Sequence, residues 1–177
     1  FCGAYGSNYA AGTLLSINKI TDIDSNKNYY PDIFYSQNIP KAGLNCFSKV
    51  IRKEDARVIW KEDAGLGNNE TPFYCDMESA GFMETSIKFV YTHNIVVLKI
   101  ISDYLEPENL DQELLKDFIG KQVPQVESII HELKGLNSSI GEFSFAGEEN
   151  EAFTVLFENL RFSEAMKQKF LKVMKTL

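Results

Sequence analysis

The chain has 177 residues, of which 24% are charged and 44% are hydrophobic, and its formal net charge is −7. This length suits one domain with an appendage, and the 13 Phe and 8 Tyr residues supply bulky groups for a core, which excludes wholesale disorder. The acidic balance argues against nucleic acid as a partner, because phosphate binding needs a clustered excess of lysine and arginine. No apolar stretch approaches the roughly 18 residues of a membrane span, so we expect no membrane partner either.

The cysteines and histidines give no sign of a metal site. Cys2, Cys46 and Cys75 lie far apart without paired spacing, so neither a disulfide framework nor a zinc site is predicted. His93 and His131 have no second ligand at a suitable distance along the chain. We therefore expect a reducing, cytoplasmic location and a protein without a metal or another cofactor.

The first residues read as the end of a buried strand that enters a glycine-rich turn. Phe1 and Cys2 are apolar, and Gly3 and Gly6 lack the Cβ atoms that would keep a ligand away from the backbone. The first residues carry no initiator methionine and no signal-like segment, so we expect the chain to begin within a fold.

Alternating or continuous apolar residues predict strands at 14–23, 46–51, 73–75 and 95–101, with an exposed loop at 25–40 and a short helix at 53–60. The run at 95–101 is the clearest, because it is short, β-branched and nearly all apolar. Those properties are typical of a central parallel strand that is covered on both faces. The run ends at Ser102 and Asp103.

Helical spacing of apolar residues predicts five further helices. The first carries Ala80, Met83, Ile87 and Val90 on one face, with Asn94 as its C-terminal cap. Two more are expected at 110–120 and 124–135, where Gly and Pro mark ends and starts, and the last two at 151–160 and 163–177 after a linker at 135–139. The alternation of strands and helices indicates an α/β domain at 1–135 and a C-terminal helical extension at 136–177.

Two acidic segments fall at the carboxyl ends of predicted strands, where ligands bind in α/β sheets. Asp76 and Glu78 lie between a strand and a helix, and Asp103 follows the most buried strand. Each has a simpler interpretation as well: Asp76 as a helix cap, Glu78 as a partner of the helix dipole, and Asp103 as a turn residue or the cap of the following helix.

The sequence Asp76-Met77-Glu78-Ser79-Ala80 is followed by a helix, by the buried strand and by Ser102-Asp103. This order and spacing resemble the nucleoside phosphorylase and nucleosidase superfamily, most closely its methylthioadenosine/S-adenosylhomocysteine nucleosidase branch. The glycine turn and Tyr30-Pro31-Asp32 are similar to further segments of that family. The resemblance covers about residues 1–135. It implies a three-layer nucleoside-phosphorylase-like fold with a central mixed sheet, here without the family's first strands.

The resemblance also implies roles for individual residues. Glu78 would bind the ribose 2′- and 3′-hydroxyls, and Met77 would pack under the sugar. Asp103, oriented by Ser102, would protonate purine N7 as the N-glycosidic bond breaks. The remaining candidates for substrate binding are Asp76, Phe47, Gly3 and Ala4, with Phe47 placed at the base.

Departures from the family favour water over phosphate as the nucleophile. Lys99 stands where an Arg is common, and Ala4 where a Ser or Thr often supplies a hydroxyl, so Lys99 and Gly6 alone remain for an anion or water site. We therefore expect a hydrolase that acts on purine nucleosides or 5′-thionucleosides, and a homodimer or higher homo-oligomer. The alternatives are a nucleoside phosphorylase, a catalytically impaired nucleoside-binding module, and an interaction protein that works through its C-terminal helices.

Overall fold

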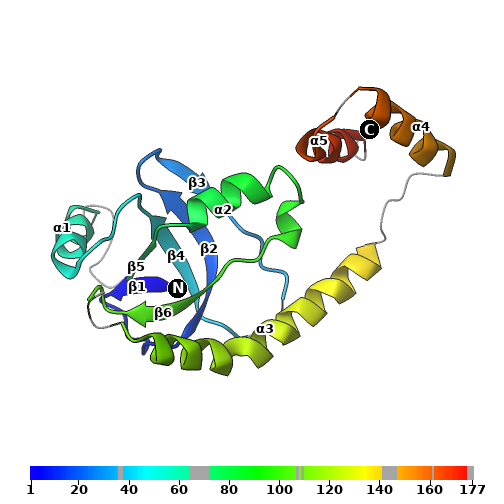
Figure 1. The fold of residues 1–177 in the computed structure, drawn as a ribbon. Helices are drawn as coiled ribbons and strands as arrows, with labels where there is room; N and C mark the ends of the chain where they lie inside the picture. The colour runs from blue at the N-terminus through cyan, green and yellow to red at the C-terminus, as the bar shows by residue number, and fades with distance from the viewer. Residues whose placement is uncertain are drawn as a thin grey trace.

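The computed structural model of the chain describes residues 1–35, 38–63, 72–106, 108, 110–140, 147–160 and 162–174. Its strands are β1 (Cys2–Tyr5), β2 (Leu14–Asp22), β3 (Lys27–Tyr29), β4 (Lys41–Cys46), β5 (Phe73–Asp76) and β6 (Leu98–Asp103). They form one mixed sheet in the order β3-β2-β4-β5-β1-β6, and β2 also pairs with β6 (Figure 1). The sheet therefore closes into a small barrel. An α/β fold with a mixed sheet and C-terminal helices is confirmed.

The helices are α1 (Lys53–Asp63), α2 (Ser79–Ser86), α3 (Gln112–Ile140), α4 (Gly147–Asn159) and α5 (Glu164–Met174). Strands β2 and β5 and helices α1, α4 and α5 lie where the sequence predicts them. The structure describes no helix that is long and apolar enough to cross a membrane.

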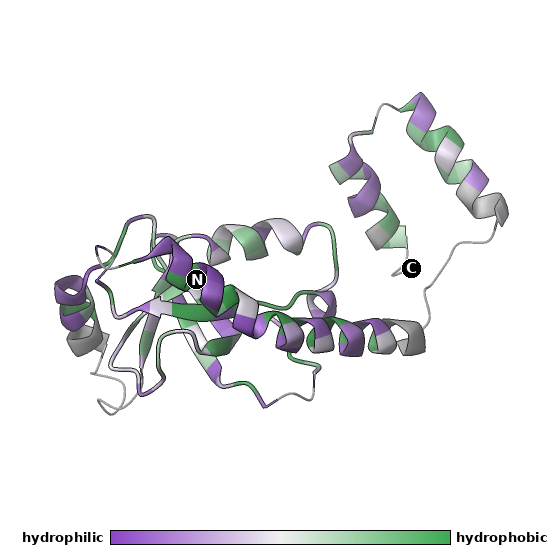
Figure 2. Cartoon of the chain, turned by 60° about the horizontal axis from the view of Figure 1, so that its bottom comes forward, coloured by the Kyte–Doolittle hydropathy of each residue, from purple (hydrophilic) through white to green (hydrophobic). Residues whose placement is uncertain are grey.

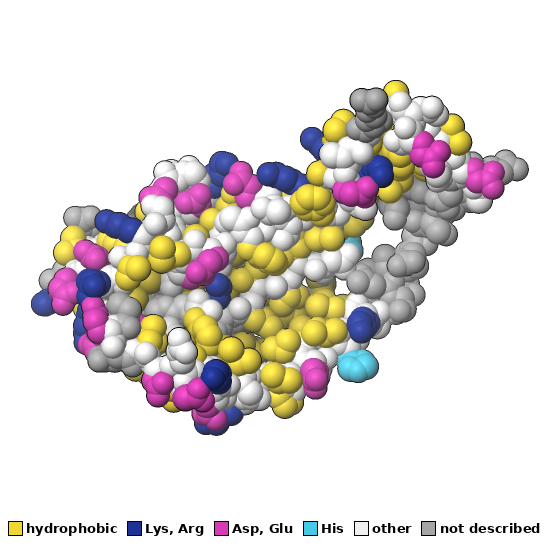
Figure 3. All heavy atoms as spheres, viewed as in Figure 1, with side chains coloured by type: hydrophobic (Ala, Val, Ile, Leu, Met, Phe, Trp, Pro, Cys, Tyr) yellow, Lys and Arg dark blue, Asp and Glu magenta, His cyan; other side chains and the backbone are white. Residues whose placement is uncertain are grey.

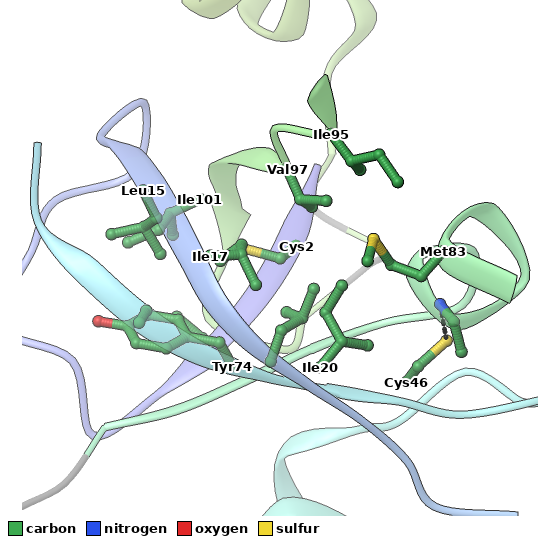
Figure 4. Close-up of a cluster of buried hydrophobic side chains, with 14 residues drawn as sticks. Cys2, Leu15, Ile17, Ile20, Cys46, Tyr74, Met83, Ile95, Val97 and Ile101 are labelled. Carbon is green, nitrogen blue, oxygen red and sulfur yellow. Dashed lines mark hydrogen bonds between the residues drawn. The ribbon is translucent and has the colours of Figure 1, made fainter. Parts of the chain in front are cut away.

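The main core joins the barrel strands to α2. Leu15, Ile20 and Ile101 are completely buried, and Met83 of α2 packs into the same cluster (Figure 4). Burying each such side chain stabilises the fold by about 1.5–3 kcal/mol, so this cluster is the main source of stability in the barrel. Ala80 and Met83 face it as the apolar spacing predicts, whereas Val90 lies beyond the helix and is exposed.

Strand β4 lies earlier in the chain than predicted. The expected strand at 46–51 is wrong, because the backbone leaves the sheet after Cys46. Phe47 and Ile51 are nevertheless buried, in a second cluster with Ala56 of α1 and Phe73 of β5. Their apolar character therefore reflects packing outside the sheet. The segment predicted as a loop at 25–40 contains the short strand β3.

Helix α3 replaces the two helices and the linker predicted between 110 and 139. It continues through Gly120, Pro124 and Gly135, which were expected to end or start helices. The reason is a single apolar face that spans the proline: Phe118 and Ile129 on either side of it are both buried. Tertiary packing of this face overrides the local preference of Gly and Pro.

Strand β6 differs from the expected central parallel strand. It begins at Leu98, and it pairs parallel with β1 but antiparallel with β2, so it lies where the barrel closes. Ile95 and Val97 are buried before the strand starts, which explains why the apolar run is longer than the strand. Asn94 ends a short 3-10 helix (Thr92–Asn94) and does not cap α2.

The glycine-rich start is only partly a turn. Gly3 and Ala4 belong to β1, and the chain turns at Gly6, whose φ is 65°. A Cβ atom on Gly3 would lie 2.3 Å from Cδ2 of Leu105. Gly3 therefore permits the close approach of a side chain, rather than of the ligand that the sequence suggested.

Helices α4 and α5 form a C-terminal helix pair with its own aromatic contacts. The rings of Phe157 and Phe170 meet edge to face at 5.7 Å, and Phe153 and Phe162 also contact Phe170. Hydrophilic and hydrophobic residues alternate around these helices and around α3 (Figure 2). The four phenylalanines are half-buried in these contacts.

Candidate active site

A cleft of about 240 Å³ opens beside the start of β1, close to the lower limit of typical ligand pockets. Its lining combines the two acidic segments that the sequence singled out with an apolar wall. The residues are Phe1, Cys2, Gly3, Lys49, Val50, Ile51, Cys75, Asp76, Met77, Glu78, Ser102, Asp103, Leu105 and Leu110. The structure thus brings together Asp76, Met77, Glu78, Ser102, Asp103 and Gly3 from the predicted set.

Strand β1 brings the two acidic segments together. It lies between β5 and β6, and Gly3 is paired with Cys75 on one side and with Asp103 on the other. Because β1 is antiparallel to β5 and parallel to β6, those two strands run in opposite directions. The segments are therefore not neighbours as the carboxyl ends of parallel strands, which was the expectation. They meet because both end beside the first residues of β1.

Asp76 is both a helix cap and part of the cleft. Its Oδ2 accepts the backbone N–H of Ser79, the first residue of α2, at 3.1 Å, and it also accepts the Ser79 hydroxyl. Asp76 thus accepts the first N–H of α2 as a cap would, although Glu78 and not Asp76 occupies the N-cap position. Lys99 Nζ lies 2.6 Å from the same oxygen, and the two side chains are 12% and 1% exposed, respectively. This is a buried ion pair, of which Asp76 also lines the cleft.

Glu78 is open to solvent. Its side chain is 76% exposed and makes no capping hydrogen bond to α2, and Lys99 Nζ lies 3.7 Å from its Oε2. Met77 beside it is also exposed. The carboxylate of Glu78 is thus held near a cation while its oxygens can still accept hydrogen bonds from a ligand.

Asp103 and Ser102 form a second polar group in the cleft. Ser102 Oγ lies 2.5 Å from Asp103 Oδ1 and 3.1 Å from the carbonyl oxygen of Cys2, while the backbone N–H of Glu106 donates to Asp103 Oδ2 at 3.0 Å. A hydroxyl has one hydrogen. When Ser102 donates it to the carbonyl, Asp103 can carry a proton and donate to Ser102. In the structure the Ser102 hydroxyl is the donor to Asp103 Oδ1.

Several predicted site residues lie away from the cleft. Phe47 packs in the second core cluster, 6.2 Å from the ring of Phe73, so it does not lie against the cleft as a base-stacking residue would. Ala4 is fully buried in the main core, and Gly6 lies at the turn after β1. Lys99, expected at an anion or water site, is instead engaged by Asp76. Its positive charge is compensated within the fold.

The apolar wall of the cleft was missed by the sequence analysis. It comes from Val50 and Ile51, which precede α1, and from Leu105 and Leu110, which follow β6. The apolar pair at 50–51 was visible, but it was assigned to a strand. Leu105 has a φ of 62°, a backbone conformation that nothing in the local sequence signals.

The cysteines in the cleft are not suited to act as nucleophiles. Burial raises the pKa of Cys2 and of Cys75 to about 12, so both remain neutral thiols near pH 7. Across the described residues, no three His, Cys, Asp or Glu side chains are grouped in a way that could hold a metal ion. Besides the two thiols, the polar side chains that line the cleft carry carboxyl, hydroxyl and ammonium groups.

No model of a known protein family matches this chain, and searches of curated proteins and of solved structures find no match either.

Proposed function

We propose that the protein is a nucleosidase that hydrolyses the N-glycosidic bond of purine nucleosides or 5′-thionucleosides. The observation that carries the proposal is the presence of Asp103 and Glu78 in one cleft, although 24 other residues separate them in the chain. The residue types and the sequence spacing of this pair resemble those of the nucleosidase branch. The closed mixed sheet with its helices is, in the same proposal, a nucleoside-phosphorylase-like fold.

In this proposal the two carboxyl groups act on opposite halves of the substrate. Glu78 binds the sugar hydroxyls, and its charge stabilises the positive charge that develops on the sugar ring. The electrons of the breaking C–N bond move into the purine, and Asp103 donates its proton to N7. Water adds to C1′ and releases a proton, which restores Asp103. The products are a free purine and a free sugar.

Ser102 would orient Asp103 during this cycle. Its hydroxyl lies between Asp103 and the carbonyl oxygen of Cys2, so it can accept a hydrogen bond from the protonated carboxyl. Protonation of the substrate then breaks that hydrogen bond. The Ser102 hydroxyl afterwards turns to donate to the ionised carboxylate.

Water fits this cleft better than phosphate as the nucleophile. The charged residues along its lining are Asp76, Glu78, Asp103 and Lys49, and Lys99 is paired with Asp76. A phosphate near the sugar would approach Glu78 and Asp76, which carry the same sign of charge. Among the lining residues, the competing phosphorylase function would have Lys49 as its cation, because Lys99 is paired with Asp76.

The test is purine release from adenosine and from methylthioadenosine, with and without phosphate. We expect release that does not depend on phosphate, and we expect Asp103→Asn to lower kcat by about 10²–10⁴. The matched control Asp22→Asn removes a carboxyl group at the C-terminal end of β2 that does not line the cleft, and should retain activity. Strict dependence on phosphate would support the phosphorylase, and nucleoside binding without turnover would support a binding module.

A further inference from the structure

We propose that Asp76 and Lys99 are a positioning pair that holds Glu78 in place for the sugar hydroxyls of the substrate. The inference rests on the proposed function, and it assigns to Lys99 a role other than the anion site suggested by the sequence. The two residues act through Glu78 and are not expected to touch the reacting atoms.

The pair has one rigid end. Asp76 is almost completely buried, and its Oδ2 is held by both the backbone N–H and the hydroxyl of Ser79 at the start of α2. Lys99 extends from β6, on the other side of β1, and its ammonium lies 2.6 Å from that oxygen. The position of the ammonium is therefore set by the barrel and by α2 together.

The other end of the pair faces the open cleft. Glu78 is 76% exposed and makes no capping hydrogen bond to α2, so its flexible side chain needs another restraint. Lys99 Nζ lies 3.7 Å from Glu78 Oε2, which is close enough for attraction but longer than a hydrogen bond. The ammonium can thus restrict Glu78 without occupying the lone pairs that a sugar hydroxyl requires.

This arrangement predicts a specific coupling between Lys99 and the sugar hydroxyls. Of the interactions with the substrate, removing the ammonium should weaken only those that Glu78 makes. A nucleoside that lacks the 2′-hydroxyl has already lost part of those interactions, so it should be less sensitive to the loss of Lys99. A residue needed only for folding would affect both nucleosides equally.

The experiment measures binding of adenosine and 2′-deoxyadenosine by calorimetry in the full-length Asp103→Asn protein, where turnover is suppressed. We expect Lys99→Met to weaken adenosine binding about tenfold or more and 2′-deoxyadenosine binding by about threefold or less, since a hydrogen bond to a charged group is lost only with the former. Lys99→Arg, which keeps the cation, should retain most of the affinity. Lys27→Met removes an exposed ion pair with Glu84, outside the cleft, and serves as the control.

A second measurement guards against a variant that is merely destabilised. In a Glu78→Gln background, Lys99→Met should add little further loss of adenosine affinity, because both changes remove the same interaction. Equal losses for the two nucleosides, or fully additive losses with Glu78→Gln, would overturn the positioning role while leaving the proposed function intact. If neither nucleoside binds to the protein, the proposed function itself fails and this inference fails with it.

Discussion

The barrel and the C-terminal helix pair bury their apolar residues to very different extents. In the barrel, Leu15, Ile20 and Ile101 have no exposed surface. In the helix pair, Phe157 and Phe170 contact each other, but Met166 and Val173 are about half exposed, and apolar side chains are visible on its surface (Figure 3). None of its side chains whose exposure is described is fully buried.

This difference bears on where a precise site can be built. A charged group such as Lys99 can be held at 2.6 Å from Asp76 only if the surrounding backbone does not move. The closed barrel provides that rigidity, because β1, β5 and β6 each pair with two neighbours. The helix pair, which has no comparable core, is held by a few aromatic contacts, each worth about 0.5–1.5 kcal/mol beyond the area that it buries.

The largest effect is expected when a large side chain is shortened to alanine in each of the two regions. Ile20→Ala should lower the free energy of unfolding of the barrel by about 2–5 kcal/mol, because a fully buried side chain leaves a cavity. Phe157→Ala should leave the unfolding of the barrel unchanged within about 0.5 kcal/mol. It should instead increase amide exchange in α4 and α5. Urea denaturation and hydrogen exchange measure both, and an equal loss of barrel stability in the two variants would contradict the comparison.

The next effect concerns the contact between Gly3 and the loop after β6. Gly3→Ala would place a Cβ 2.3 Å from Leu105 Cδ2, and we expect a loss of about 1–3 kcal/mol in the free energy of unfolding. In the Leu105→Ala background, Gly3→Ala should lower the free energy of unfolding by less than it does in the natural chain, because the clash with Leu105 is absent. Additive losses in denaturation experiments would show that the two residues do not meet.

A smaller effect is expected from pH. Burial raises the pKa of Cys2 and Cys75 from 9.0 to about 12, so in the folded barrel both thiols keep protons that the unfolded chain releases above pH 9. Unfolding therefore becomes more favourable as the pH rises from about 9 towards 12. The free energy of unfolding should fall more steeply over this range in the natural chain than in Cys75→Ala. Equal slopes in the two proteins would show that this thiol is not shielded.

The smallest effect is expected from surface ion pairs in both regions. Lys53 pairs with Glu106 beside the cleft at 2.9 Å, and Lys167 pairs with Glu164 in α5 at 2.7 Å. The charged groups of both pairs have access to solvent, so screening leaves little net interaction. Lys53→Ala and Lys167→Ala should leave the thermal midpoint of the barrel unchanged within error. A clear shift of the thermal midpoint for Lys53→Ala alone would show that this ion pair stabilises the wall of the cleft.

The sequence predicts those elements whose signal is local. Alternation along residues 14–23 predicts β2 almost to its ends, and the helical spacing after 151 predicts α4 and α5. Helix α3 could not be predicted as one element, because Gly120 and Pro124 are local signals for helix ends. The buried face that keeps the helix continuous depends on contacts with residues far away in the chain, such as Leu14 and Ile39.

The candidate site shows the same limit. Asp76, Glu78 and Asp103 were singled out from residue type and spacing, and they do line one cleft. The apolar wall could not be anticipated, because it depends on the conformation of Leu105 after β6. The pairing of Lys99 with Asp76 could not be predicted either, since it depends on β1 lying between β5 and β6.

Closure of the barrel also affects how the protein behaves at high concentration. A strand at the open edge of a sheet can pair with a strand of another molecule and start aggregation. Among the described strands, only β3 lacks a second neighbour, and it is three residues long and begins with Lys27, which forms an ion pair with Glu84 of α2. Short length and charge are the features that discourage strand addition. The hydrogen bonds that join β2 to β6 thus close the sheet and leave β3 as the one described strand with an open edge.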